Sequence, residues 1–101
     1  MATEYRKERV AFVFENNQLF LMQSSGPRWR GLWHMPPASI MRTAPDHSLE
    51  YAITRYKVRL DVISQPWQHD SLLTGFPVAD LDALPMPAPH RRALVAMLAG
   101  G

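Results

Sequence analysis

The chain has 101 residues, of which 47% are hydrophobic and 20% are charged, and its formal net charge is +2. This composition is that of one globular domain, and it excludes both a disordered chain and a chain with two hydrophobic cores. Because the sequence contains no cysteine, these residues form no disulfide, no zinc–thiolate site and no iron–sulfur cluster.

Residues 9–23 are predicted to form two strands around a tight turn. The first of them is apolar on both faces, as expected for a strand that is covered on both sides. Asn16 and Asn17 tolerate the positive φ that a hairpin turn requires. The short apolar stretch at residues 32–35 is predicted to be a third strand, which two prolines end because neither can donate to a β-ladder.

A helix is predicted over residues 46–56. Asp46 or Ser48 is able to cap it. Its apolar residues recur at the i, i+3, i+4 and i+7 positions that form one helical stripe: Leu49, Ala52, Ile53 and Tyr56.

Two further strands are predicted at residues 59–65 and 70–78. Gly75 is expected to form a bulge in the second of them, and Pro77 to mark its edge or exit.

Residues 79–101 are predicted to form a short helical turn, a proline-braced link and a helix that begins near Pro89. The predicted buried stripe of this helix is Leu94, Val95 and Leu98, and Gly100 and Gly101 end it. The resulting order, β-β-β-α-β-β-α, favours an α+β fold in which helices sandwich a mixed β-sheet.

Arginine dominates the basic residues, since only Lys7 and Lys57 of the eleven are lysines. The planar guanidinium group binds phosphate bidentately and stacks on rings. A net charge of +2 does not by itself indicate nucleic acid binding. The basic residues occur in four clusters, which would indicate an anion-binding surface only if the fold brings some of them together. They are Arg6–Lys7–Arg9, Arg28–Arg30, Arg55–Lys57–Arg59 and Arg91–Arg92.

The stretch RWRGLWHMPP, residues 28–37, combines indole and guanidinium groups in a loop that is followed by a stiff double proline. Loops carry function more often than the elements that they connect. Arg28, Trp29 and Arg30 therefore form a candidate site that pairs with phosphate and stacks on a base. The alternative is a solvated loop that leads into a buried Leu32 and Trp33.

No motif in the sequence defines an active site. His34, His47, His69 and His90 lack the spacing of metal ligands. No phosphate-binding glycine loop is present, and the nearby carboxylates of residues 80 and 82 are better explained by helix capping or solvation.

Two stretches resemble the C-terminal, Nudix-like domain of the MutY family of adenine DNA glycosylases. RGLWHMPP resembles that domain's GLW-x-(F/L)-P segment, and ADLDALPMPAPHRRAL, residues 79–94, resembles its last stretch. The resemblance extends over residues 9–98 and implies a single Nudix-like domain within residues 1–101. The leucine-proline run is its most specific part, because many Nudix proteins share GLW-x-x-P.

The catalytic Nudix motif GX5EX7REUXEEXGU is degenerate here. Aligned from Ala38, which replaces the first glycine, it places the following residues where glutamates hold Mg²⁺ in active family members: Ala44, Ile53, Tyr56 and Lys57. Ala52 replaces the arginine and Arg59 the second glycine, and only Leu60 agrees. Magnesium requires clustered oxygen ligands, so we expect no metal and no catalytic residue in this chain.

The resemblance implies a DNA-repair recognition domain that helps a glycosylase read 8-oxoguanine opposite adenine and is not catalytic on its own. The implied partners are double-stranded DNA with an 8-oxoguanine:adenine mismatch and an upstream helical catalytic domain. That domain, with its iron–sulfur cluster, is absent from this chain. Two alternatives remain open: a free-standing Nudix hydrolase of a nucleoside diphosphate derivative, and a catalytically dead domain that binds a nucleotide or a protein.

In the MutY family, an (F/L)-(S/T)-H turn between two strands probes the guanine. The resemblance places Leu73, Thr74 and Gly75 at that turn, with the Thr74 hydroxyl facing a base edge and Gly75 in place of the histidine. Arg91 and Arg92 are secondary candidates for DNA contacts. No apolar run reaches the length of about 20 residues that a membrane span needs, and the N-terminus lacks a signal peptide. A cytoplasmic, reducing location without membrane contact is therefore expected.

Overall fold

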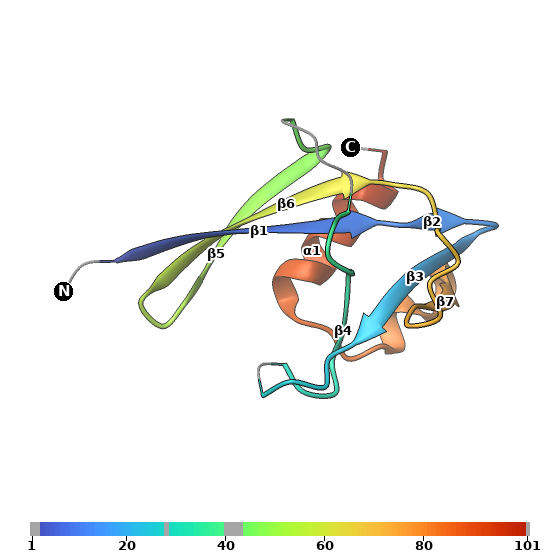
Figure 1. Ribbon diagram of the computed structural model, residues 1–101, viewed down its shortest axis with the longest axis horizontal. Helices are drawn as coiled ribbons and strands as arrows, with labels where there is room; N and C mark the ends of the chain where they lie inside the picture. Colours follow the sequence, from blue (N-terminus) through green and yellow to red (C-terminus); the bar gives the residue numbers. More distant parts are fainter. Residues whose placement is uncertain (1–2, 28, 40–43, 101) are drawn as a thin grey trace.

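Two β-sheets and a C-terminal helix make up the protein, which is represented by a computed structural model that describes residues 3–27, 29–39 and 44–100 (Figure 1). The N-terminal segment of the chain contributes one strand to each sheet. β1 (Glu4–Phe12) belongs to the first sheet, and after Val13 the chain continues as β2 (Phe14–Glu15) of the second sheet. The molecule is elongated, with a longest dimension of 47 Å.

The first sheet has the strand order β1-β6-β5 and is mixed. β1 pairs in parallel with β6 (Tyr56–Ser64), so that Glu4 lies opposite Tyr56 and Phe12 opposite Ser64. β5 (His47–Ile53) pairs with β6 antiparallel, as the other half of a hairpin. The strand ends near the N-terminus project away from the rest of the molecule, at the left of Figure 1.

The second sheet is antiparallel and is centred on β3 (Gln18–Gln23). β2 and β7 (Thr74–Pro77) pair with β3, and β4 (Trp33–His34) pairs with its far end. Asn16 and Asn17 both have positive φ, at 53° and 60°, in the turn between β2 and β3. The predicted hairpin and the short third strand are therefore confirmed.

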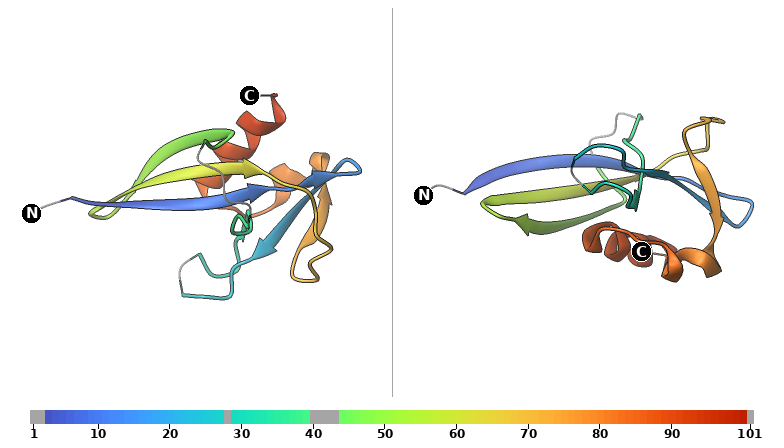
Figure 2. Two further views of the ribbon diagram at one scale, coloured as in Figure 1. Left: turned by 45° about the horizontal axis from the view of Figure 1, so that its top comes forward. Right: turned by 90° about the horizontal axis from the view of Figure 1, so that it is seen from below.

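The helical part of the chain begins after β7. A 3₁₀ helix, η1 (Val78–Ala83), and a proline-rich link lead into α1 (Ala88–Leu98), which has proline in its first turn. α1 packs beneath the first sheet, as the right-hand view of Figure 2 shows. No helix among the described residues is long and apolar enough to cross a membrane.

Two apolar clusters lie on opposite sides of the first sheet. The larger one lies between the sheets and the helical part of the chain, and its buried residues are Val10, Phe12, Leu19, Leu21, Met35, Leu60, Val62, Leu81, Ala93 and Leu94. In the smaller one, Ala11, Val13 and Phe20 pack against Ala38, Trp67 and Leu73. The predicted two-sided burial of the first strand is confirmed by these clusters.

The prediction of a helix over residues 46–56 is wrong. The segment forms β5, a two-residue turn and the start of β6. Its apolar residues also fit a period of two, and Leu49, Tyr51 and Ile53 lie on one face of the sheet. Burial of that face against α1 stabilises the strand, and this tertiary packing overrides the helical spacing.

Two local predictions are also wrong. Val95 is 64% exposed, because the buried face of α1 runs through His90, Ala93 and Leu94 instead. Gly75 forms no bulge, since it pairs in regular register with Phe20. A Cβ at this position would lie 3.0 Å from the Phe20 ring, which stacks on Trp67 at a centroid distance of 4.3 Å.

We therefore expect Gly75→Ala to destabilise the domain by about 1–3 kcal/mol, because the buried Phe20 ring has no space into which to move. Urea denaturation measures the free energy of unfolding. Gly26→Ala is the matched control, since a Cβ there meets no atom within 4 Å, and we expect a change within about 0.5 kcal/mol. Equal effects of the two substitutions would contradict this reading of Gly75.

Candidate nucleic-acid interface

The hairpin of β5 and β6 occupies the part of the chain where a catalytic Nudix protein carries its glutamate-bearing helix. Ile53, Tyr56 and Lys57 stand at three of the glutamate positions, and they lie at the exposed end of this hairpin. Mg²⁺ requires several hard oxygen ligands. These side chains supply one hydroxyl group and one ammonium group, so they do not fit a magnesium ion.

Acidic groups elsewhere do not replace that set within the described part of the chain. No group of three or more histidine or acidic side chains among those residues is arranged to hold a metal ion. The acidic residues of this hairpin, Glu50 and Asp61, lie on the sheet face away from α1.

The parallel pairing of β1 with β6 brings two of the basic clusters together. Lys7 lies directly opposite Arg59, and Lys57 lies opposite Tyr5 on the same face of the sheet. Like charges opposite each other on neighbouring strands destabilise a sheet. Arg59 also lies opposite Glu50 and donates a hydrogen bond to Asp61, so its charge is partly compensated. Lys7 and Lys57 extend this row toward the exposed end of the sheet, where cations are suited to anionic phosphate groups.

Asp61 is the buried carboxylate beneath this row, with 5% of the residue exposed. Its Oδ1 accepts hydrogen bonds from the Ser48 hydroxyl at 2.7 Å and from Nε of Arg59 at 2.9 Å. Burial alone would raise the pKa of Asp61. The hydrogen bonds from Ser48 and Arg59, with the charges of Arg59 and Lys7, outweigh burial and hold the pKa below its usual value.

The turn at the exposed end of the hairpin is conformationally unfavourable. Thr54 has a positive φ of 49°, a region that β-branched residues rarely adopt. Its hydroxyl donates to the backbone oxygen of Ile53 at 2.7 Å. Strain of this kind is concentrated at functional sites, whereas the turn between β2 and β3 uses the more tolerant asparagine.

Two arginines flank the aromatic ring beside this turn. The guanidinium carbon of Arg6 lies 4.3 Å from the centroid of the Tyr56 ring, and that of Arg55 lies 5.7 Å from it. We call the group Arg6, Lys7, Arg55, Tyr56 and Lys57 the basic tip. It combines cations with a partly exposed ring at the projecting end of the first sheet, where a carboxylate oxygen of Glu4 also lies 3.9 Å from the Arg6 guanidinium group.

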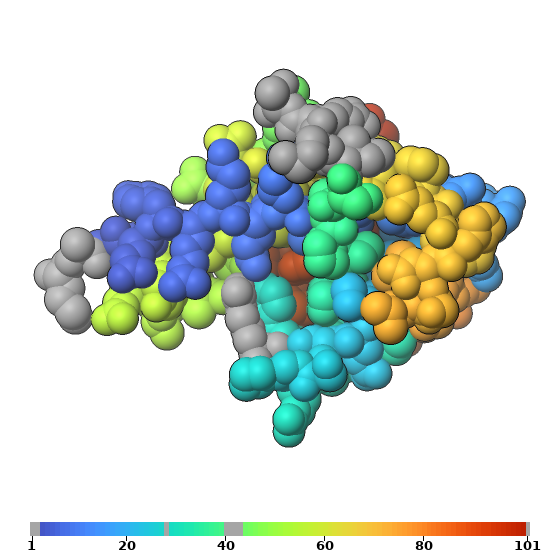
Figure 3. Space-filling model, in the orientation of Figure 1, coloured from blue at the N-terminus to red at the C-terminus, as the bar shows by residue number. Residues whose placement is uncertain are grey.

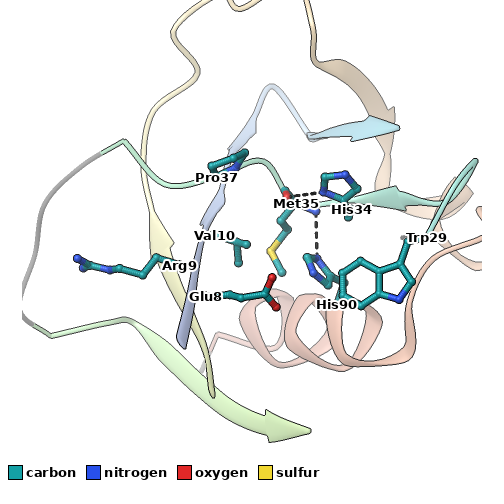
Figure 4. A pocket seen from close by; sticks show the side chains of 8 residues that line it. All are labelled: Glu8, Arg9, Val10, Trp29, His34, Met35, Pro37 and His90. Atoms are coloured by element: carbon teal, nitrogen blue, oxygen red, sulfur yellow. Dashed lines mark hydrogen bonds between the residues drawn. The ribbon is translucent and has the colours of Figure 1, made fainter. Parts of the chain in front are cut away.

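A pocket of about 390 Å³ lies on the α1 side of the first sheet. Figure 3 shows it as a hollow between β1 in blue and the cyan and teal segment, with α1 in orange-red at its floor. Its lining residues, which Figure 4 shows from close by, are Glu8, Arg9, Val10, Trp29, His34, Met35, Pro37 and His90. Of these, sequence reasoning identified only Trp29. The sequence does contain a signal for Glu8. It lies two residues before the buried Val10 on the same strand, so both side chains are on the same face of the sheet.

The structure describes two of the three loop residues that were predicted to form a site. Trp29 lines the pocket and has a positive φ of 59°. Arg30 is exposed. Arg28 lies outside the described residues.

Thr74 and Gly75 lie in β7, at the end of the molecule away from the basic tip (Figure 1). The turn before them closes at Leu73, whose N–H donates to the backbone oxygen of Asp70 at 3.2 Å. Arg91 donates to the backbone oxygens of Leu81 and Leu84 and so braces η1 against α1. Arg92 is exposed on α1.

The sequence matches no protein-family model and no curated protein. Among solved structures, the chain is similar to the NUDIX domain of Shewanella oneidensis NrtR complexed with ADP ribose, with a TM-score of 0.56 and 14% identity. The similarity covers 92% of this chain and 85% of that one. The protein therefore has a Nudix fold, and the predicted α+β class with a mixed sheet is confirmed.

We expect Asp61→Asn to destabilise the domain by about 1–2 kcal/mol at pH 7, because it removes a charge that accepts two hydrogen bonds. The folded-state pKa lies below the unfolded value, so this stabilisation is lost as the pH falls through the folded-state pKa. Urea denaturation from pH 7 down to about pH 3 should therefore show the two stabilities converging at low pH. A difference that stays constant would contradict the role assigned to the carboxylate.

Thr54→Asn should stabilise the domain by about 1 kcal/mol, because asparagine adopts a positive φ at lower cost. The reciprocal control is Asn17→Thr in the other hairpin, where φ is 60°, and it should destabilise by a similar amount. Thermal denaturation of both variants measures the two effects. If Thr54→Asn is neutral while Asn17→Thr destabilises, the turn at Thr54 is not strained.

Proposed function

We propose that this protein is a DNA-recognition domain that keeps the Nudix fold and does not hydrolyse nucleotides. The observation that carries the proposal is the hairpin of β5 and β6, which stands in place of a glutamate-bearing helix and ends in the basic tip. In this proposal, the part of the chain that carries metal-binding glutamates in catalytic Nudix proteins carries the cations of the basic tip instead. Its partly exposed ring and its guanidinium groups suit stacking on a base and pairing with phosphate.

The resemblance to the adenine glycosylase domains supports a lesion-reading role for the turn of this hairpin. Their guanine-probing turn has the form apolar–hydroxyl–histidine and lies between two strands. In this chain Ile53, which ends β5, is followed by Thr54 and Arg55 in the turn to β6, and the three have that form with arginine in place of histidine. Thr74 and Gly75 have the hydroxyl and the small residue but are paired within β7. We therefore assign the base contact to Thr54 and Arg55.

The row of cations behind the turn is suited to the DNA backbone. Lys57 follows the turn by two residues, and Lys7 and Arg59 lie opposite each other two pairs further along the sheet, on the same face. Such contacts position a duplex without reading its sequence. A turn that reads the base and strands that hold the phosphates would together orient the domain on double-stranded DNA.

The proposed biological substrate is a duplex with an 8-oxoguanine:adenine mismatch, and the proposed partner is a helical glycosylase domain that removes the adenine. This assignment rests on the MutY-like stretches at residues 30–37 and 79–94. The domain would supply recognition, and its partner the chemistry.

Arg55→Ala and Thr54→Val should reduce the preference for a duplex containing 8-oxoguanine:adenine over one containing guanine:adenine. One neutral hydrogen bond contributes about 0.5–1.5 kcal/mol, so the preference read by the Thr54 hydroxyl should be several-fold. Fluorescence anisotropy with labelled duplexes measures the two affinities. Thr74→Val, on β7, is the matched control. A loss of preference in that control, with none in the hairpin variants, would move recognition to β7.

Lys57→Ala should weaken binding of both duplexes equally and lower the slope of log affinity against log salt by about 0.9, the value for one phosphate contact in B-DNA. Arg92→Ala, at the secondary candidate on the exposed side of α1, removes one cation away from the hairpin, and we expect it to change the slope less than Lys57→Ala does. Titrations at several salt concentrations give both slopes. Identical slopes for Lys57→Ala and the unchanged protein would exclude a phosphate contact by Lys57.

The alternative of a free-standing Nudix hydrolase is distinguished by turnover. We expect no release of phosphate or pyrophosphate above a protein-free blank from ADP-ribose or from normal and oxidised nucleoside triphosphates, with Mg²⁺ or Mn²⁺ present. The solved NUDIX domain of NrtR is complexed with ADP ribose, which makes this compound the first substrate to test. Robust metal-dependent turnover would contradict the proposal.

A further inference from the structure

β5 forms an open edge of the first sheet (Figure 1). Among the strands that the structure describes, only β6 pairs with it. The pair Ile53 and Tyr56 closes the tight turn between the two strands, so the backbone groups of the odd-numbered residues of β5 bond to β6. The N–H and C=O groups of Ser48, Glu50 and Ala52 therefore point outward, where they offer a template for a further strand.

The other edge of this sheet is protected against such pairing. A neighbouring segment covers the C-terminal part of β1: the Ala11 N–H donates to the Pro36 backbone oxygen at 2.8 Å, and the Ala38 N–H donates to that of Arg9 at 3.2 Å. The N-terminal part of β1 carries charged side chains at every position from 4 to 9 except Tyr5. Charges on an edge strand oppose pairing with another chain.

β5 has few of these protections. The stretch His47–Ile53 contains neither proline nor lysine, and it pairs with β6 in unbroken register. Its one charged side chain is Glu50, at the centre of the strand. On the α1 side, Leu49 and Tyr51 are half-buried and pack against the larger apolar cluster. The edge is thus held in an extended form, which lowers the entropy cost of adding a strand, and a further strand would cover more of these two side chains.

The position of Glu50 disfavours a second copy of this chain as the occupant of the edge. A two-fold antiparallel pairing that uses the whole of β5 would place the two Glu50 carboxylates opposite each other, and like charges directly opposite destabilise a sheet. Glu50 forms no ion pair with a described residue, because its cross-strand neighbour Arg59 donates to Asp61 instead. A foreign strand with a cation opposite Glu50 would instead gain a favourable cross-strand pair.

We propose that β5 is a docking site for an extended segment of another protein, which adds to the first sheet as an antiparallel strand with a lysine or arginine opposite Glu50. The residues on either side of that cation would lie beside Leu49 and Tyr51 on the α1 side, so they are expected to be apolar. The next residue in each direction would lie beside Ser48 or Ala52 and is expected to be small or hydroxylated. Main-chain hydrogen bonds supply the affinity, and the alternating side chains supply the specificity.

Fluorescence anisotropy with the labelled peptides VTVKVTV and VTVEVTV, each flanked by flexible GS linkers, tests the charge requirement. We expect the lysine peptide to bind about three- to tenfold more tightly, because the exchange replaces an attractive cross-strand pair by a repulsive one. Glu50→Lys should reverse this preference. Asp80→Lys is the matched control, since Asp80 is an exposed carboxylate in η1, and it should leave the preference for the lysine peptide unchanged.

N-methylation of the lysine peptide tests the pairing itself. In the proposed register the N–H of the central lysine faces β5, whereas the N–H of each adjacent valine faces away from it. A methyl group on the lysine nitrogen should weaken binding about tenfold, because it removes a ladder hydrogen bond and holds the strands apart. A methyl group on an adjacent valine nitrogen should have little effect. This comparison uses the unchanged protein, so it holds even if Glu50→Lys impairs folding, which thermal denaturation reports.

Sedimentation velocity of the free protein tests the other occupant, and we expect a monomer. A dimer that the lysine peptide dissociates would show that a second copy covers β5 and would overturn the proposal. Equal affinities for the two peptides, equal weakening by the two methyl groups, or no binding of either peptide would also overturn it. These outcomes are independent of DNA recognition, because the duplex tests change Thr54, Arg55 and Lys57 and leave Glu50 in place.

Discussion

The parallel register between β1 and β6 is the constraint on which the rest of the structure depends. It aligns Glu4 with Tyr56 and continues unbroken to Phe12 and Ser64. Because side chains alternate along a strand, the register sorts β1 into two rows. Lys7 joins the cations of β6 on one face, while Glu8 and Val10 face α1 on the other. A slip of one residue would exchange the two rows and expose the core.

The two candidate regions differ in how they are held. The pocket is held by long-range contacts: the Met35 N–H reaches His90 on α1, and Tyr51 of β5 reaches Glu8 of β1. The basic tip lies beyond the core and is held mainly by strand pairing and by ring contacts around Tyr56. The pocket is therefore built from elements that are distant in the sequence, whereas the tip is formed by the ends of paired strands.

The sequence indicated the strands of the second sheet and the terminal helix, because their signals are local. Asn16 and Asn17 mark a hairpin turn by their tolerance of positive φ, and Pro89 lies in the first turn of α1. The hairpin of β5 and β6 was not indicated, since its apolar residues satisfy both helical and strand periods and Thr54 is an atypical turn residue. Packing against α1 decides between these periods, and no local pattern contains that information.

The candidate site was predicted only in part, for the same reason. Trp29 was recognised from its loop, but Glu8 and His90 become neighbours of that loop only through tertiary structure. The cations of residues 6–9 and 55–59 were visible as separate clusters, and the parallel pairing that unites them was not. Asp61 lies within an apolar strand, and only the bonds from Ser48 and Arg59 explain how its charge is accommodated.

The parallel pairing also has a consequence for the order of folding. The hairpins of β2–β3 and β5–β6 join near neighbours in sequence, whereas β1 must find a strand that lies roughly half the chain away, and such non-local pairing is slow because loop closure costs entropy. Docking of β1 is therefore expected late. Glu8 reaches Tyr51, and Lys7 reaches Arg59, only in that step. A chain that has formed its hairpins but not docked β1 would have neither the pocket nor the cationic row, so ligand binding would report completion of the fold.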